Sequence, residues 1–318
     1  MVLGVMTIYP LKFKPFYLEK VWGGDRLRTA LGRKIPLKKI GESWEVSTHS
    51  KGISIVRNGD FTGMSLQQLV GLYKEELLGK KFSNETSFPL LIKIIDAAEA
   101  LSVQVHPDDD FAAKVEGHSG KSEAWYVLEA GEDAKIIYGL QPGVDKSQLA
   151  EALENNTIMN KLRHVPVRAG DLIYVPAGTV HAISGGVMVY EIQQTSDITY
   201  RLYDYERKEK GMLRELQVEK ALACLKASKQ PDTDFRRSSL ITPFFRIERY
   251  NVHGQLPCST QGAYVLLCVM EGVGEIAWCK GHEPIGKGDT VLVPACLGDF
   301  VVTGSVSGLM IRPRGNHA

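Results

Sequence analysis

Three short segments of the sequence carry side chains that could hold a metal ion. Gln104 and His106 lie two residues apart in SVQVHPDDD, and Lys121 and Glu123 have the same spacing in KSEAWYV. Side chains two residues apart in a β-strand point to the same face. His181 follows a turn in the third segment, PAGTVHAI. Imidazole together with carboxylate is a common ligand set for zinc, and these residues around one cavity would leave room for water or a substrate.

Each of these residues also has an ordinary structural explanation. A histidine before a proline, such as His106, is more often a turn or core residue than a metal ligand. Glu123 at the start of a strand would usually be a solvated edge residue. His181 after a turn is equally ambiguous by itself, so the decision depends on the sequence around all three.

Two of the segments match the sequence motifs of cupin β-barrels. Residues 170–181 fit the second cupin motif up to its usual final Asn, where this chain has Gly185. The first cupin motif is commonly His-x-His followed by Glu, and here Gln104 replaces the first histidine. The order and context of the candidate ligands therefore favour a metal site over three unrelated structural residues.

The elements that would position these side chains are mainly strands. Short runs rich in Val, Ile and Tyr, separated by many of the 31 glycines, predict a mainly antiparallel β architecture. The expected strands are 54–57, 90–95, 124–128, 171–175, 187–192, 263–270 and 289–293. Helical spacing of apolar residues predicts a helix over residues 66–79 with Ser65 as its N-cap, and further helices over 145–163 and 215–226.

The sequence also contains an internal repeat. VRAGDLIYVPAGTVHAI (167–183) resembles PIGKGDTVLVPACLGDFVV (284–302), with Gly-Asp at a tight turn, a strand with a buried face, and Pro-Ala at the strand exit. His181 then corresponds to Asp299, so the second copy lacks the histidine. We predict duplicated cupin (jelly-roll) β-barrels with a few inserted helices. Residues 1–235 would form the catalytic module, and residues 236–318 a cupin-like module without metal ligands.

Several stretches resemble the type I mannose-6-phosphate isomerases in their shorter bacterial and archaeal form. LSVQVHPDD resembles the LSxQxHPD motif of that family, GKSEAWYVL its Lys-x-Glu-x-Trp/Tyr segment, and YEIQQTSDITYRLYDYER its Glu-x5-Asp-x3-Arg segment. VWGG (21–24) and GESWEVS (41–47) are also similar, so the resemblance covers most of residues 9–210. It implies an aldose-ketose isomerase that interconverts D-mannose 6-phosphate and D-fructose 6-phosphate. The implied ligands of one zinc ion per chain are Gln104, His106, Glu123 and His181.

The implied reaction moves a proton between C2 and C1 of the sugar through an enediol. Such a transfer needs a base beside those carbons and a group that stabilises charge on the sugar oxygens. The family's active-site arginine falls at Arg201, whose guanidinium suits the second task, although it could also be a surface arginine on a strand. The base could be Glu191 or Asp197, which match acidic positions of the family. It could also be Lys121, if partial desolvation near zinc lowers the pKa of its amine. Glu191 could instead brace a ligand histidine and Asp197 cap a turn, so the sequence leaves the base open.

Ser102 and Arg207 are the candidates for binding the phosphate of the substrate. Ser102 lies two residues before Gln104 and so shares its face, and Arg207 falls where family members carry a basic residue. A hydroxyl and a guanidinium are suitable phosphate partners. An ordinary strand hydroxyl and a solvated charge are the alternatives. The sequence has no glycine-rich P-loop, so it does not indicate nucleotide binding.

Three other functions share parts of this pattern. Two histidines and a carboxylate also bind iron in non-haem oxygenases on cupin barrels, but an oxygenase does not require Gln104, Lys121 or Arg201. A cupin isomerase acting on glucose 6-phosphate would usually keep His-x-His, which Gln104 breaks. A sugar-binding or regulatory cupin with a decayed site would have lost ligands, whereas the first copy of the repeat retains all four.

Composition and charge exclude several classes of partner. Lys and Arg number 38 and Asp and Glu 37, so the net charge of +1 provides no basic field for nucleic acid or a membrane surface. The N-terminal stretch lacks the pattern of a signal peptide, and no stretch approaches the length of a membrane-spanning helix. The five cysteines form no CxxC pair, which indicates a reduced protein. We expect a cytoplasmic monomer or homodimer whose partner is a small sugar phosphate.

Overall fold

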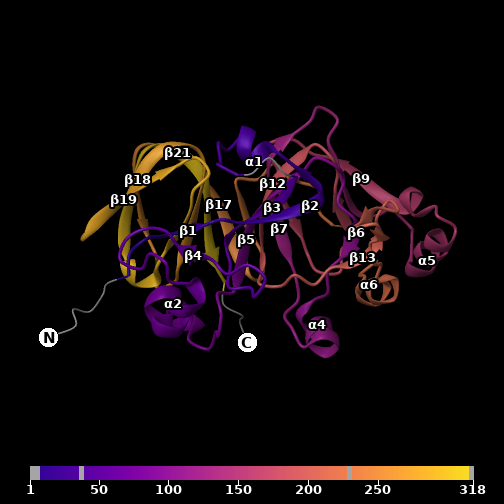
Figure 1. Cartoon of the computed structure of the whole chain (residues 1–318), viewed down its shortest axis with the longest axis horizontal. Helices are drawn as coiled ribbons and strands as arrows, with labels where there is room; N and C mark the ends of the chain where they lie inside the picture. Colours follow the sequence, from indigo (N-terminus) through magenta and orange to yellow (C-terminus); the bar gives the residue numbers. More distant parts are fainter. Residues whose placement is uncertain (1–7, 36–38, 228–230, 315–318) are drawn as a thin grey trace. The chain divides into compact units, whose positions relative to one another are not determined.

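The computed structural model describes residues 8–35, 39–227 and 231–314 (Figure 1). The chain divides into two units, each built from separate segments. Unit 1 comprises Met1–Phe16, Glu45–Pro89 and Ser238–Ala318, and unit 2 comprises Tyr17–Trp44 and Leu90–Arg237. Antiparallel strands are the main regular secondary structure of both units, so the prediction of a mainly β protein is confirmed.

Unit 1 contains an eight-stranded sheet. Its strand order is β16-β17-β21-β18-β20-β1-β4, and β19 pairs with β18. The strands are β1 (Leu11–Lys14), β4 (Ile55–Val56), β16 (Ser239–Ile241), β17 (Phe245–Ser259), β18 (Val265–Trp278), β19 (Gly281–Gly286), β20 (Thr290–Val293) and β21 (Asp299–Pro313). Side chains alternate between the two faces of these strands, and one face provides an apolar core that includes Leu267, Val291 and Val302.

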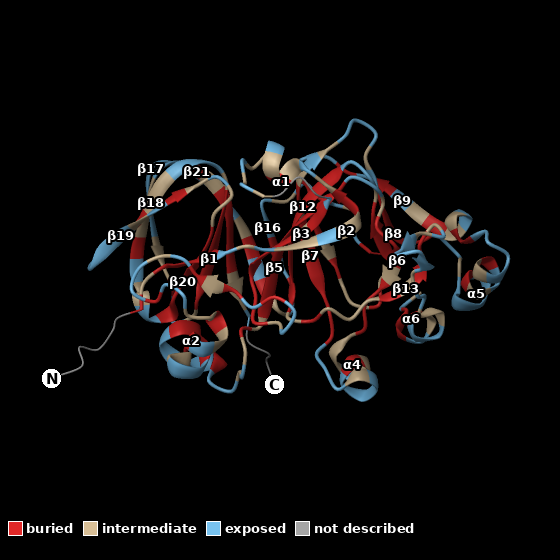
Figure 2. Cartoon of the chain, viewed as in Figure 1, coloured by how far each residue is buried: buried red, intermediate tan, exposed pale blue. Residues whose placement is uncertain are grey.

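The helical elements of unit 1 are short. They are α2 (Leu66–Leu72), α3 (Lys74–Leu78), η1 (Lys80–Phe82) and η3 (Ala295–Leu297). Ser65 caps α2 as predicted, because its Oγ accepts from Gln68 N while the Gln68 side chain accepts from Ser65 N. The single helix expected over 66–79 is broken at Tyr73 (φ −132°), where Gly71 weakens the helix and the Tyr73 ring packs edge-on against Phe61. Figure 2 shows the outer face of α2 exposed and its inner face buried.

Two further sheets lie mainly in unit 2, and only the ends of β2 and β3 belong to unit 1. Their strand orders are β10-β7-β12-β5-β2-β3 and β13-β6-β11-β8-β9. The strands are β2 (Phe16–Gly24), β3 (Ile40–Val46), β5 (Leu90–Ala97), β6 (Val103–Val105), β7 (Glu123–Ala130), β8 (Lys135–Leu140), β9 (Leu162–Pro166), β10 (Leu172–Val175), β11 (His181–Ile183), β12 (Val187–Gln194) and β13 (Tyr200–Tyr203). Trp125 and Val189 of the first sheet and Tyr138 and Ile183 of the second belong to one buried core, which therefore lies between the two sheets.

Unit 2 also contains helices and a small hairpin. They are α1 (Arg26–Thr29), α4 (Asp109–Glu116), α5 (Lys146–Glu154), η2 (Ile158–Lys161), α6 (Val218–Cys224), and the hairpin β14 (Lys208–Glu209) and β15 (Met212–Leu213). The helix expected over 145–163 is shorter than predicted, because Asn156 takes a left-handed φ of 53° and a 3-10 turn follows. The helix expected over 215–226 is α6, which buries Ala221 and Cys224 against β6 and β13.

The two units repeat one strand arrangement, as the sequence repeat predicts. In unit 2, β7 lies between β10 and β12, and in unit 1, β18 lies between β20 and β21. Gly170 (φ 88°) and Gly288 (φ 85°) provide the left-handed backbone of the corresponding turns. Asp171 and Asp289 each accept, through Oδ2, a hydrogen bond from the backbone N–H three residues earlier.

Three sequence predictions concern membranes, secretion and thiols. The described part of the chain contains no helix that is long and apolar enough to span a bilayer. Residues 1–7, on which the signal-peptide expectation partly rests, lie outside the described residues. All five cysteines are free thiols.

Candidate active site

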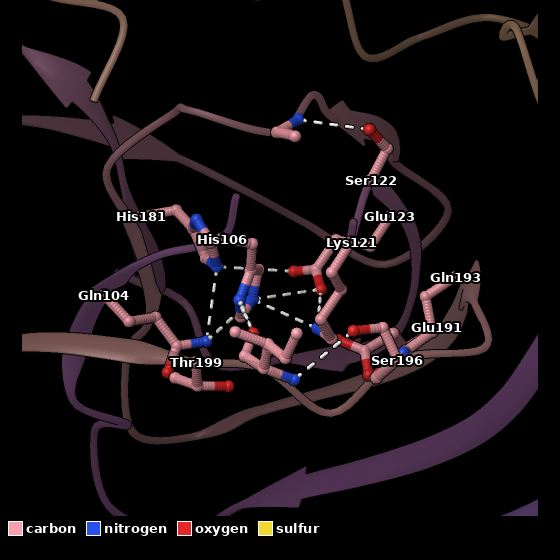
Figure 3. A network of polar contacts seen from close by, with 12 residues as sticks. Gln104, His106, Lys121, Ser122, Glu123, His181, Glu191, Gln193, Ser196 and Thr199 are labelled. Carbon is pink, nitrogen blue, oxygen red and sulfur yellow. Dashed lines mark hydrogen bonds and ion pairs between the residues drawn. The ribbon is translucent and has the colours of Figure 1, made fainter. Parts of the chain in front are cut away.

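Three buried side chains from separate strands converge in unit 2 (Figure 3). His106 directly follows β6, Glu123 begins β7, and His181 begins β11. One potential ligand atom of each lies within 4.8 Å of the others, and all three side chains are buried. Within the described ranges, these residues form the group of His, Cys, Asp and Glu side chains that is compact enough to hold one metal ion.

Backbone carbonyls fix both imidazoles in the orientation that a metal requires. His106 Nδ1 lies 2.8 Å from Ile198 O, and His181 Nδ1 lies 2.9 Å from Thr179 O. Because a carbonyl oxygen only accepts, each Nδ1 donates, and each neutral ring presents the lone pair of Nε2. Burial lowers the pKa of His181, and burial with the nearby charge of Lys121 lowers the pKa of His106 to about 3. Both rings are therefore neutral, as metal ligands must be.

The carboxylate of Glu123 faces both imidazoles. Its Oε1 lies 3.4 Å from His181 Nε2, and its Oε2 lies 3.3 Å from His106 Nε2. All of these atoms are acceptors, and Oε1 has no hydrogen-bond partner among the described residues. Converging lone pairs of this kind fit a bound cation, and the set of imidazole and carboxylate ligands fits zinc.

Lys121 brings one positive charge to this cluster. Its Nζ donates to Glu123 Oε2 and lies 3.0 Å from His106 Nε2. Burial alone would raise the pKa of Glu123, but Lys121 together with the neighbouring His106 and His181 outweighs burial and holds that pKa well below its ordinary value. Glu123 is therefore ionised, and Lys121 and Glu123 project to the same side, as their spacing predicts.

The sheet register places Gln104 between His181 and Arg201. On β6, Gln104 lies directly opposite His181 of β11 and directly opposite Arg201 of β13. Residues directly opposite each other on neighbouring strands share a face. Gln104 Nε2 lies 3.3 Å from His106 Nε2 and 3.2 Å from His181 Nε2. Rotation of the amide by half a turn exchanges its nitrogen and oxygen, which would present the oxygen as a fourth ligand.

Arg201 lies on β13, and Asp197 lies on the segment just before that strand. Arg201 is half-buried on β13, and its Nε has no hydrogen-bond partner among the described residues. Burial, followed by the charge of Arg214, lowers the pKa of Arg201. Asp197 lies on the segment between β12 and β13, next to the residue whose carbonyl holds His106, and its carboxylate is not part of the compact ligand group.

Ser102 lies on the segment that leads into β6, and Arg207 donates a hydrogen bond to the same segment. Ser102 is buried, and its Oγ donates to Gln104 Oε1 over 3.2 Å. Arg207 Nη2 donates to Ala100 O, two residues before Ser102, and lies 3.2 Å from Asp204 Oδ1. The structure thus connects both candidate phosphate residues to the strand that carries Gln104.

Glu191 belongs to a buried ion pair that was not predicted from the sequence. Lys93 lies directly opposite Glu191 in the β5–β12 ladder, with Nζ 3.1 Å from Glu191 Oε2. Trp125 Nε1 donates to Glu191 Oε1 over 3.2 Å. Burial and the charge of Glu123 raise the pKa of Glu191. The available sequence signal was a single lysine in the apolar run LLIKIIDA, because a buried lysine needs a charged partner.

Glu42 extends this cluster of buried charges. Its Oε1 lies 2.8 Å from Lys20 Nζ, and its Oε2 lies 3.9 Å from Lys93 Nζ and accepts from Trp44 Nε1 over 2.8 Å. Burial alone would raise the pKa of Glu42, but Lys93 and Lys20 lower it to about 2. The segment GESWEVS therefore supplies a carboxylate that supports Lys93.

Lys93→Met is expected to lower the free energy of unfolding by about 3 kcal/mol or more, because it leaves the buried carboxylate of Glu191 without its cation and removes one of the two cations of Glu42. Adding Glu191→Gln should restore part of this loss by removing one uncompensated charge. Urea unfolding of the single and double variants measures both effects. Lys135→Met, at an exposed position of β8, serves as the control. Equal stability of Lys93→Met and the wild type would show that the cluster does not stabilise the fold.

Family models match two parts of the chain. Residues 11–132 match the phosphomannose isomerase type I catalytic domain, and residues 237–313 match the mannose-6-phosphate isomerase cupin domain. The chain is 39% identical over 311 residues to mannose-6-phosphate isomerase ManA of Bacillus subtilis, which covers 94% of this chain and 97% of that protein. It is 38% identical over 295 residues to a mannose-6-phosphate isomerase of Streptococcus mutans, which covers 90% of this chain and 92% of the relative.

The fold of the chain is also similar to that of a solved mannose 6-phosphate isomerase. The crystal structure of the mannose 6-phosphate isomerase from Bacillus subtilis superposes with a TM-score of 0.88 at 33% identity, covering 96% of this chain and 99% of that one. Together with the cupin-domain match, this similarity confirms the predicted duplicated cupin fold. The chain belongs to the type I mannose-6-phosphate isomerases.

Proposed function

We propose that this chain interconverts D-mannose 6-phosphate and D-fructose 6-phosphate at one zinc ion held by Gln104, His106, Glu123 and His181. The named activity of the two bacterial relatives supports the choice of substrate. The observation that carries the metal site is the meeting of two neutral imidazoles with a carboxylate whose Oε1 is unpartnered among the described residues. When bound, zinc supplies a Lewis acid that stabilises negative charge on sugar oxygens.

Arg201 is the residue proposed to share that stabilisation. It lies in one row of the sheet with Gln104 and His181, so its side chain leaves the sheet on the face that carries the metal ligands. Its guanidinium is always charged, and its Nε is a buried donor without a hydrogen-bond partner among the described residues. A fixed donor of this kind stabilises an enediolate oxygen without having to reorganise during the reaction.

Lys121 is the proposed proton-transfer group. Its Nζ already touches Glu123 and His106. Glu191 is less suited to this role, because Trp125 and Lys93 hold its two oxygens. We therefore assign Glu191 to the support of the cluster and keep Asp197 as the alternative base.

Isomerisation in D2O tests the proton-transfer mechanism. An enediol that exchanges its proton with solvent predicts deuterium at C1 of fructose 6-phosphate, which NMR detects. Complete retention of the C2 hydrogen at C1 would instead indicate a hydride shift. Absence of any conversion would contradict the proposed reaction. The cytoplasmic location and the choice between monomer and homodimer stay predictions from the sequence.

A further inference from the structure

Arg207 and Arg214 share one buried aspartate at the base of the β14–β15 hairpin. Asp204 is only 4% exposed, with its Oδ1 3.2 Å from Arg207 Nη2 and its Oδ2 accepting from Arg214 Nη1 over 2.9 Å. The backbone N–H of Arg214 donates to Arg207 O over 3.1 Å, so the two arginines are neighbours across the hairpin. The charge of Arg214 also contributes to the lowered pKa of Arg201. Two guanidinium groups thus share one carboxylate, and Arg201 interacts electrostatically with both Asp204 and Arg214.

The backbone of this turn is held in an uncommon conformation. Tyr205 (φ 56°) and Glu206 (φ 53°) are consecutive left-handed residues, and Arg207 N closes the turn by donating to Asp204 O over 3.0 Å. Residues other than glycine stay in this region when surrounding contacts hold them, and they cluster at ligand sites. The ion pairs of Asp204 with Arg207 and Arg214 provide such contacts.

One donor beside Asp204 has a hydrogen-bonding requirement that the described residues do not meet. Arg207 Nη1 is buried and lacks a hydrogen-bond partner among these residues. Buried donors in folded proteins nearly always have a partner. A phosphate oxygen would accept a hydrogen bond from this donor and so meet the requirement.

We propose that Arg214 is a positioning residue of the site that binds the phosphate monoester of the substrate. With Asp204 it would fix the guanidinium of Arg207, while Ser102 supplies a further donor. This inference rests on the proposed function, and it adds two residues that neither the motifs nor the resemblance identified.

The location of these residues agrees with a sugar phosphate that reaches the metal ligands. Arg207 binds Ala100 O, and the chain then runs through Ser102 to Gln104. Because Ser102 Oγ lies 3.2 Å from Gln104 Oε1, a phosphate bound by both Arg207 and Ser102 would lie within the length of a hexose phosphate from Gln104. A phosphate near Arg207 would therefore leave the opposite end of the sugar near Gln104.

Arg214→Gln is expected to raise the KM for mannose 6-phosphate and the inhibition constant of inorganic phosphate by about tenfold, because Arg207 loses part of its orientation. The kcat should change by less than about threefold, since Arg214 does not contact the reacting carbons. Arg214→Lys retains the charge and should recover part of the affinity. Arg246→Gln, which breaks an exposed ion pair with Glu248 in unit 1, is the matched control. Asp204 is a poor test position, because its removal leaves two neighbouring guanidinium groups without their shared carboxylate.

Calorimetric titration with inorganic phosphate separates this inference from the proposed reaction. Weaker phosphate binding by folded Arg214→Gln than by the wild type supports the inference, whether or not the wild type converts the sugar. Equal phosphate binding by the two proteins, or an unchanged KM in a folded variant, overturns it even if the isomerase activity is intact.

Discussion

His181→Ala is expected to reduce isomerase activity at least about a thousandfold and to leave the protein without bound zinc, because a metal that stabilises oxyanions contributes several kcal/mol to such a reaction. A hydrogen bond and a strand pairing fix the position of His181. Its Nδ1 contacts Thr179 O, and its place at the start of β11 puts it opposite Gln104. Alanine keeps the strand but removes one of the two imidazoles that face Glu123.

Metal content by mass spectrometry and kcat with mannose 6-phosphate measure this effect together. His164→Ala, at an exposed position of β9, removes an imidazole from the same unit and should leave both quantities unchanged. A folded His181→Ala protein that keeps its zinc and its kcat would contradict the assigned ligand set.

Arg201→Gln is expected to lower kcat by about a hundredfold to a thousandfold while the zinc content stays unchanged. The reason is that Arg201 shares the face of the metal ligands without belonging to the compact group that they form. Its loss therefore removes stabilisation of the developing oxyanion and leaves the ligand geometry in place. Steady-state kinetics and metal analysis of the same protein preparation test both parts.

Arg201→Lys is the informative companion variant. It keeps a positive charge but not the planar fork of donors, so its kcat should lie between those of the wild type and Arg201→Gln. A kcat within about threefold of the wild type in Arg201→Gln would exclude the oxyanion role. Loss of zinc in that variant would instead make Arg201 a support for Gln104.

The part of the site that could be predicted from the sequence is the part set by local spacing. Lys121 and Glu123 are two residues apart at the start of a strand, and their side chains touch. The pairing of Gln104 with His181 joins residues 77 positions apart, so only the recurrence of family motifs could suggest it. Periodicity says which face a side chain takes, whereas register between distant strands depends on the whole fold.

The charged supports of the site could not be predicted for the same reason. Lys93 meets Glu191 through the β5–β12 register, and Asp204 joins Arg207 to Arg214 through a turn with two left-handed residues that are not glycine. Turn prediction relies on Gly, Asn and Asp at such positions, and Tyr205-Glu206 has neither glycine nor asparagine.

The division of the chain into two structural units likewise depends on pairing between strands that are distant in the sequence. The modules proposed for residues 1–235 and 236–318 remain a proposal. In the structure, the N-terminal strand β1 pairs with β20, and Met1–Phe16 and Glu45–Pro89 belong to unit 1 together with the C-terminal segment. Neither composition nor glycine content marks the points where the chain leaves one unit and enters the other.

A coupled assay of mannose 6-phosphate conversion, before and after treatment with a chelator, tests the central claim most directly. The proposed site predicts that activity disappears when the metal is removed and returns when zinc is added. Full activity in protein shown to be free of metal would contradict the zinc site. Failure of the zinc-loaded protein to convert mannose 6-phosphate, with glucose 6-phosphate also unreacted, would contradict the isomerase function.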